Sequence, residues 1–210
     1  MKVSKILGSV LLTATLTLTF QPAELLAQEP ATPEARTDAR TQETRYVLGG
    51  ATFVKLAPAF INALGSLRIF PSAVGPGALI SRSGALTAAF PITTGAVDPS
   101  PVFAVLDHSG GLSLATVRNR ASITSFIIDS KTGQLSGLVT CDSNLVGRVP
   151  LFNLRLTQAP RINDLQMTID DVSLTLTSGA ASALSNCLGR TIPPIEIGSA
   201  QVRAMLGPRL

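Results

Sequence analysis

The segment Asp107-His108-Ser109-Gly110-Gly111 places the three residue types of a hydrolytic triad in a row. Triad members are normally brought from distant positions and oriented by the fold. Adjacent side chains on an extended segment point to opposite faces, so Asp107 and Ser109 cannot readily reach the same edge of His108. A Gly-x-Ser-x-Gly nucleophile elbow is also missing. We therefore expect no catalytic residues and no enzyme activity, with a secreted hydrolase using this trio as an alternative.

His108 is the single histidine of the chain. An imidazole can ligate a metal or haem iron, or can act as a pH-sensitive switch. It can also simply hydrogen-bond the backbone beside Gly110-Gly111, and both interpretations stay open. We expect no metal site, because Cys141 and Cys187 would have to recruit His108 or distant carboxylates as further ligands.

The amino-terminal residues predict a targeting segment followed by a linker. Lys2 and Lys5 precede an apolar run at 6–20, and Leu25-Leu26-Ala27 offers a cleavage point. The run is shorter than the roughly 20 residues that a membrane-spanning helix needs, so residues 1–27 indicate a secretory signal, with an uncleaved anchor as the alternative. Residues 28–45 are too polar to bury a core and indicate a disordered tether. We expect one domain at 46–210, secreted or held at the cell surface, with no later membrane span.

Two cysteines, Cys141 and Cys187, remain in this exported chain. An even number of cysteines in an oxidising compartment favours a disulfide. Two buried free thiols are the alternative. A bridge would close a loop of about 45 residues and stabilise the fold by roughly 3–4 kcal/mol in the chain-entropy model.

The composition narrows the class of partner. Aromatic residues make up 4% of the chain, tryptophan is absent, and the formal net charge is +4. The arginines are scattered rather than grouped, and aromatic residues for base stacking are scarce, so we expect no nucleic-acid partner. No phosphate-binding or dinucleotide motif is present. Weak attraction to an anionic surface is an alternative to ordinary solvated charge.

Short aliphatic, β-branched segments recur between Gly, Pro, Asn and Asp, which predicts strands. Residues 129–133 (DSKTG) form the clearest hairpin turn. Helical spacing of apolar residues is confined to two segments, 57–67 and 178–188. The fold class that follows is mainly β: an antiparallel sandwich or curled sheet with two short helices. Strands are predicted at 52–56, 77–80, 85–90, 103–106, 112–117, 121–128, 135–140, 149–156 and 165–177.

The last predicted strand carries two further signals. Leu165, Met167 and Ile169 alternate on one parity and residues 172, 174 and 176 on the other, so a bulge at Asp170-Asp171 is needed to keep one apolar face. A cation site at the aspartate pair is the alternative, although Ca²⁺ takes six to eight oxygen ligands. Residues 172–184 also align without gaps with 52–64. We infer a strand–helix–strand repeat at about 52–80 and 172–203, with Pro-containing turns, that brings the ends of the domain together.

Two runs in the middle of the chain resemble a known protein family. The runs FPITTGAVD (90–98) and LDHSGGLSL (106–114) resemble the middle of HtaA-type domains, exported bacterial β-modules of which some take up haem. The resemblance extends loosely over residues 52–140. It implies a cell-surface or secreted module with His108 near the family's haem-pocket histidine. Haem-binding members use a tyrosine ligand on the preceding segment, where this chain has Phe60. Its one tyrosine is Tyr46.

These observations predict an exported, non-enzymatic module that binds a ligand or serves an envelope structure. Its partner would be an unidentified small molecule or cell-surface component, and no resident cofactor is expected. Haem binding through His108, with Tyr46 as a second contributor, is the alternative that the resemblance implies.

Overall fold

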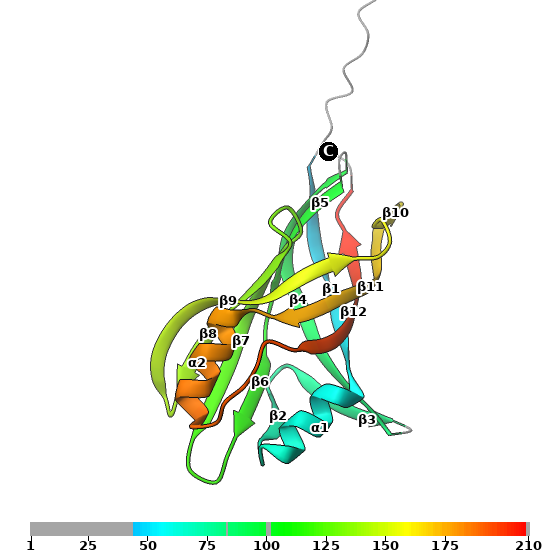
Figure 1. Cartoon of the computed structure of the whole chain (residues 1–210). Helices are drawn as coiled ribbons and strands as arrows, with labels where there is room; N and C mark the ends of the chain where they lie inside the picture. The colour runs from blue at the N-terminus through cyan, green and yellow to red at the C-terminus, as the bar shows by residue number, and fades with distance from the viewer. Residues whose placement is uncertain (1–43, 83, 100–101, 209–210) are drawn as a thin grey trace, which may run out of the picture. The chain divides into compact units, whose positions relative to one another are not determined.

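The computed structural model describes residues 44–82, 84–99 and 102–208, which form twelve strands and two short helices (Figure 1). The predicted class, mainly antiparallel β with two short helices, is confirmed. The predicted signal (1–27) and most of the predicted tether (28–45) lie outside the described residues, and the first strand begins at Arg45. The strands are β1 (Arg45–Leu56), β2 (Phe70–Val74), β3 (Ala78–Arg82), β4 (Ala85–Pro99), β5 (Val102–His108), β6 (Gly111–Ala115), β7 (Arg120–Asp129), β8 (Gln134–Cys141), β9 (Asn144–Leu156), β10 (Arg161–Asn163), β11 (Gln166–Leu176) and β12 (Glu196–Leu206). The helices are α1 (Pro58–Ser66) and α2 (Ser178–Leu188). Neither is long and apolar enough to cross a bilayer.

The sheet closes on itself. Strands β7, β5, β4, β1, β12, β11, β9 and β8 are neighbours in that order, and β8 pairs again with β7. All of these pairings are antiparallel. The first strand, β1, pairs with the last, β12, so the two ends of the domain meet. Eight strands enclose an interior that side chains can nearly fill or that can hold one small ligand.

Period-two alternation turns one set of side chains into this interior. In β8, for example, Leu135 and Val139 are buried while their neighbours are at least partly exposed. The predicted bulge in β11 is confirmed, because the register with β12 shifts between Ile169 and Val172 and Asp171 has a positive φ of 51°. The bulge lets both halves of β11 bury their aliphatic side chains. The core also draws on other ring strands through Val54, Leu106, Ile128, Leu151 and Val202.

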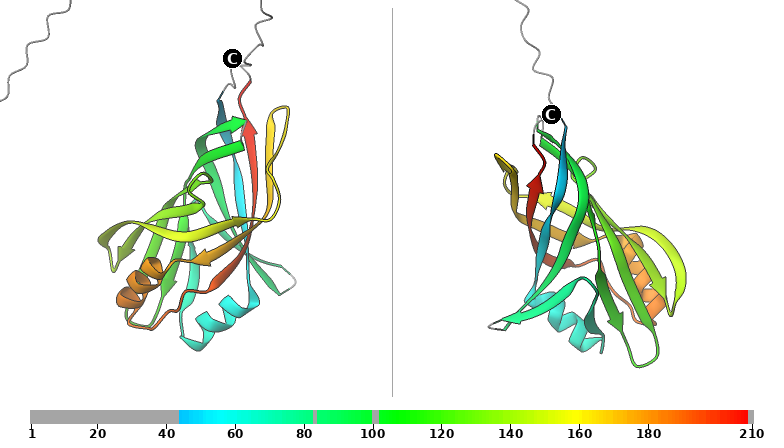
Figure 2. Two further views of the ribbon diagram at one scale, coloured as in Figure 1. Left: turned by 45° about the horizontal axis from the view of Figure 1, so that its top comes forward. Right: turned by 180° about the vertical axis from the view of Figure 1, so that it is seen from behind.

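Near the helices the closed sheet divides into two half-sheets. Hydrogen bonds between strands join the half-sheets to each other only farther from the helices. The first half of β7 pairs with β6 instead of β5, and β6 pairs with β2. Strand β9 meets β11 only over Phe152–Leu156. Helix α1 leads from β1 in one half-sheet to β2 in the other, and α2 follows β11 and packs against β7 and β9 (Figure 2). We call this region, with α1, α2 and the β6–β7 turn (116–119), the helical end.

The two helices occupy similar places after their strands, and the strand–helix–strand repeat stays a prediction. Both follow a ring strand directly, and equivalent positions are buried in each copy: Val54, Leu56, Phe60 and Leu64 in the first, Leu174, Leu176, Ala180 and Leu184 in the second. Beyond the helices the two paths differ. The turn predicted at 69–71 is instead the start of β2, where Pro71 sits in a strand that pairs only with β6. An edge strand tolerates the missing amide donor of a proline.

The two helices are anchored differently. In α2, Thr177 accepts a hydrogen bond from the backbone N–H of Ala180 at 3.0 Å, and Gly189 ends the helix in the left-handed conformation. A disulfide joins Cys187 of α2 to Cys141 of β8, with their Cα atoms 5.6 Å apart, so the predicted bridge is confirmed. Helix α1 has no side-chain cap. Its last turn meets the loop after α2, where Arg190 Nε donates to the Leu67 carbonyl at 3.3 Å.

Removing the disulfide should weaken the fold measurably. The bridge joins residues separated by 46 positions, so the Cys141→Ser/Cys187→Ser variant should lose roughly 3–4 kcal/mol of unfolding free energy. Urea unfolding followed by circular dichroism measures this loss, with Ser143→Ala as a control on an exposed neighbouring position. An unchanged unfolding midpoint would contradict the assigned anchoring of α2.

Candidate functional site

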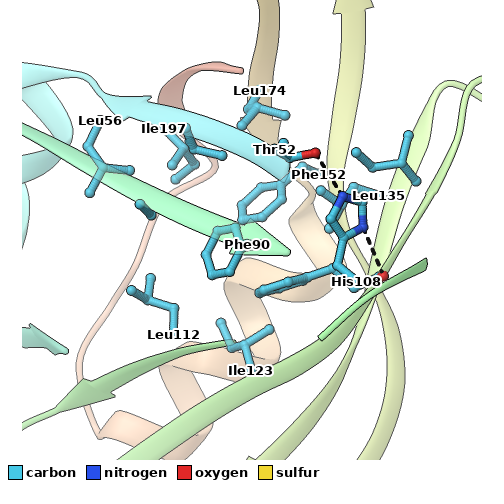
Figure 3. Close-up of a pocket in the computed structure, with 14 residues that line it drawn as sticks. Thr52, Leu56, Phe90, His108, Leu112, Ile123, Leu135, Phe152, Leu174 and Ile197 are labelled. Atoms are coloured by element: carbon cyan, nitrogen blue, oxygen red, sulfur yellow. Dashed lines mark hydrogen bonds between the residues drawn. The ribbon is translucent and has the colours of Figure 1, made fainter. Parts of the chain in front are cut away.

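His108 is the last residue of β5 and is turned into the interior, where its side chain is 5% exposed. Its Nδ1 lies 3.3 Å from the carbonyl oxygen of Phe126, and its Nε2 lies 2.7 Å from the hydroxyl of Thr52 on β1 (Figure 3). Because a carbonyl can only accept, Nδ1 carries the proton, and Nε2 of the neutral ring accepts from the Thr52 hydroxyl. The imidazole thus joins three strands and has no free nitrogen.

Burial sets the protonation state of this histidine. Desolvation lowers the pKa of His108 below its ordinary value of 6.5, against opposing contributions from the backbone carbonyls of Phe126 and Leu106 and from the charge of Asp107. Desolvation penalises the charged imidazolium more than the neutral ring. His108 is therefore neutral at pH 7, as its hydrogen bonds require.

A cavity of about 50 Å³ lies beside His108 inside the closed sheet. It belongs to a hollow with about 550 Å³ of atom-free space, part of which is open solvent. Thr52 and His108 supply the only heteroatom-bearing side chains of the lining, and they bond each other. The other lining residues are apolar: Val54, Leu56, Ala88, Phe90, Leu112, Ile123, Phe126, Ile128, Leu135, Phe152, Leu174 and Ile197. A water needs two to four polar partners, so this cavity favours apolar occupants.

A second cavity of about 20 Å³ lies next to the first and continues into the ring. The two share Thr52, Val54, Ile128, Leu135 and Leu174 in their linings. The second extends to Ile169, Val172, Ala200 and Val202 on β11 and β12. The interior therefore holds two adjoining, largely apolar spaces rather than one round chamber.

The predicted hydrolytic trio is not assembled. Both ring nitrogens of His108 are engaged by Thr52 and Phe126. The backbone N–H of Ser109 bonds the carbonyl of Pro91, and the backbone carbonyl of Asp107 accepts from Thr93. Neither Asp107 nor Ser109 orients the imidazole. The alternative hypothesis of a hydrolytic triad at 107–109 therefore has no geometric support.

The structure does not bring Tyr46 to His108. Tyr46 is 63% exposed and lies six residues before Thr52 on β1, about 20 Å along an extended strand. A register shift between Val47 and Gly49 changes the parity of β1, so Val47 and Thr52 both face inward. Tyr46 consequently points away from the interior, and Thr52 takes the place beside the imidazole.

The aspartate pair in β11 is a charged surface cluster. Asp170 accepts hydrogen bonds from Gln201 and Arg161, and Arg203 lies 3.4 Å away. The Gln201 hydrogen bond, followed by those cations, lowers the pKa of Asp170. Among the described residues, no group of three or more His, Cys, Asp or Glu could hold a metal ion.

The residues around the cavity do not fit haem in this conformation. Both nitrogens of His108 are bonded within the protein, and no tyrosine or cysteine lines the cavity. The space is also well below the roughly 300–1,000 Å³ of ordinary small-molecule pockets. Haem ligation by His108 would require the Thr52 bond to break and the interior to open.

Sequence reasoning found His108 but missed its partners. Thr52 is the one polar side chain on the inward face of the second half of β1, beside Val54 and Leu56. An isolated polar residue in an apolar alternation signals a buried hydrogen bond. The Phe90–Phe126 ring pair, with centroids 4.8 Å apart, left no such signal because phenylalanine is common in cores.

The fold and site together define a closed antiparallel sheet with an apolar interior and two bridging helices. Solved structures share this fold. The C-terminal domain of HtaA from Corynebacterium glutamicum matches with a TM-score of 0.59 and 16% identity, over 78% of this chain and 99% of that one. A domain-swapped dimer of a histidine-to-alanine variant of the same domain matches with a TM-score of 0.52 and 16% identity, over 71% and 91%.

A third structure, the heme binding protein HtaB from Corynebacterium glutamicum, matches with a TM-score of 0.51 and 8% identity, over 78% of this chain and 95% of that one. No protein-family model and no curated protein matches the chain. The resemblance to HtaA-type domains is thus confirmed, and at these identities it establishes the fold alone.

The neutral state of His108 predicts a pH dependence of stability. Because its pKa is lowered in the folded protein, the unfolded chain binds a proton that the folded protein does not once the pH falls below about 6.5. Unfolding free energy should therefore decrease from about pH 7.5 to about pH 5, and His108→Gln should flatten that decrease. Urea unfolding of the parent protein and of His108→Gln at both pH values measures this decrease. Equal pH slopes in the two proteins would contradict a buried neutral imidazole. Asp170 titrates in a separate, more acidic range below 3.8.

Proposed function

We propose that the protein is an exported, non-enzymatic binding module that takes a slender apolar molecule into its closed sheet beside His108. The observation that carries this proposal is the pair of adjoining, largely apolar cavities, one beside His108 and one farther into the ring. Thr52 and His108 bond each other there, and Ser130 in the second lining accepts the backbone N–H of Ala104 at 2.8 Å, so an apolar occupant displaces none of these hydrogen bonds. The cavities, of about 50 Å³ and 20 Å³, are smaller than an extended hydrocarbon chain, so the interior must widen for this ligand too, although by less than for a broad ring system.

Features typical of an exported chain support this proposal. The segment 1–27 has the features of a secretory signal, and 28–45 those of a tether. The Cys141–Cys187 disulfide suits an oxidising compartment. A carrier or receptor for an apolar molecule is useful there because such molecules are poorly soluble between membranes and cell surface.

The helical end supplies a route for a ligand. Leu56 and Ile197 line the cavity and lie directly beside the start of α1, where the Ala57 N–H bonds the Ile197 carbonyl at 2.8 Å. Helix α2 is held by a disulfide, whereas α1 is held by non-covalent contacts. Movement of α1 would therefore widen the interior while α2 and the ring stay in place.

Filling the cavity should block binding. We expect Ala88→Leu, which adds bulk inside the cavity, to weaken binding of cis-parinaric acid about tenfold or more, because the added side chain occupies the ligand's space. Ala89→Leu is the matched control, since Ala89 neighbours Ala88 on β4 and lies beside the partly exposed Phe53. Probe fluorescence measures affinity, and circular dichroism checks folding.

Two outcomes would count against this proposal. One is a parent protein that leaves probe fluorescence unchanged. The other is equal affinity in both variants, which would place the probe on the surface. Should Ala88→Leu fail to fold, Ala200→Val reduces the second cavity with a smaller addition.

Haem binding is the second candidate, favoured by the fold shared with the heme binding protein HtaB. It requires His108 to leave Thr52, or a ligand other than His108. Hemin titration distinguishes the two candidates. We expect no Soret shift that depends on His108, because the imidazole is already bonded on both sides. A shift in the parent protein that His108→Ala abolishes and Ala89→Leu retains would replace the first proposal with haem binding, and Tyr46→Phe would then test the second contributor.

A further inference from the structure

The fold gathers arginines that are scattered in the sequence. At the helical end, Phe70 of β2 pairs with Ala115 of β6, which places Arg68 beside the β6–β7 turn. That turn is held by the Thr116 N–H bonding the Asn119 carbonyl at 2.8 Å, and it carries Arg118. The hydrogen bond from Arg190 to the Leu67 carbonyl brings the loop after α2 to the same place.

Six side chains at this end face solvent, and we call them the basic rim: Arg68, Phe70, Val117, Arg118, Arg120 and Arg190. Phe70 is 63% exposed and Val117 is 92% exposed. Large apolar side chains with such exposure beside several cations are unlike an ordinary solvated turn. The basic rim thus combines apolar side chains, which are stabilised by leaving water, with guanidinium groups, which bind anions.

The rim is not neutralised by the protein. Among the described residues, the carboxylate in contact with it is that of Asp142, which accepts the backbone N–H of Arg120 at 2.6 Å. The ion pairs of the described residues include none of the four rim arginines. The arginines in the described ion pairs, Arg161 and Arg203, belong to the Asp170 cluster instead. The far end of the ring carries Asp98 and Asp129 beside Lys131, and Asp164 beside the buried Arg45, so acidic side chains are more frequent there than around the basic rim.

We propose that the basic rim docks on an anionic phospholipid bilayer, with the arginines on lipid phosphates and with Phe70 and Val117 in the headgroup region. Guanidinium groups bind phosphate in bidentate geometry, and basic residues beside apolar ones are the physical signature of attachment to a membrane surface. This inference deepens the proposed function and rests on it: docking would place α1 and the apolar cavity against the membrane from which a hydrocarbon chain would enter.

Vesicle co-sedimentation tests the rim. The exported full chain is mixed with vesicles of phosphatidylcholine alone or with about one third phosphatidylglycerol, at low and high salt. Arg68→Gln/Arg118→Gln should bind the anionic vesicles about twenty-five-fold more weakly, since each arginine near a charged bilayer contributes roughly fivefold. The matched control is Lys131→Gln/Arg155→Gln, which removes two exposed cations away from the rim. It should bind like the parent.

Phe70→Ser/Val117→Ser gives an independent check, because it removes the apolar contacts and leaves all charges. It should also weaken vesicle binding. If the rim variant Arg68→Gln/Arg118→Gln and the control variant weakened vesicle binding equally, the proposal would be overturned, because only net charge would then matter. So would equal binding to neutral and anionic vesicles, or binding to poly-glutamate without binding to vesicles, which would indicate an acidic protein partner.

The two proposals fail separately. Vesicle binding is measured without the fatty-acid probe, and probe binding is measured without vesicles. Loss of the first alone removes the docking surface and leaves the binding module. Loss of the second alone removes the apolar ligand and leaves a protein that docks on membranes for another purpose.

Discussion

Closure of the antiparallel sheet is the constraint on which the rest of the structure depends. Once β8 pairs with β7, the inward side chains of eight strands share one largely apolar interior. Any polar group turned into that space must find a partner there. His108 and Thr52 meet this requirement across the ring, with the Phe126 carbonyl completing the imidazole's bonds. At the opposite end the buried Arg45 follows the same logic, donating to the carbonyls of Gly207 and Asp164.

The helical end is where this closed design is relaxed. Strand β6, with β2 at its other edge, replaces β5 beside the first half of β7, and two short helices bridge the half-sheets. One helix is fixed by a disulfide and a capped end, and the other by a hydrogen bond between loops. The apolar cavities lie inside the same region, and the basic rim surrounds its outer face. A ligand space, a less restrained helix and a surface suited to lipid phosphates thus occur together.

Local patterns in the sequence predicted much of this, and tertiary pairing accounts for what they missed. The hairpin at 129–133, both helices and the bulge at Asp170-Asp171 follow from alternation, helical spacing and turn residues, which are short-range properties. Closure of the ring could not be predicted in this way, because it depends on pairing between strands as distant as β1 and β12. Strand β2 was missed because Pro71 suggests a turn, and its only support is an edge position beside β6. His108 stood out as the single histidine. The hydrogen bond that occupies its Nε2, and so keeps it from ligating a metal, comes from Thr52, 56 positions earlier.

The central claim is that an apolar chain occupies the interior beside His108. Nuclear Overhauser contacts between an isotope-labelled medium-chain fatty acid and the methyl groups of the protein test it most directly. The account predicts contacts to Val54, Ile123 and Leu174, which line the cavity. Contacts confined to exposed methyl groups such as Leu145 and Val146, with none to the interior, would contradict it.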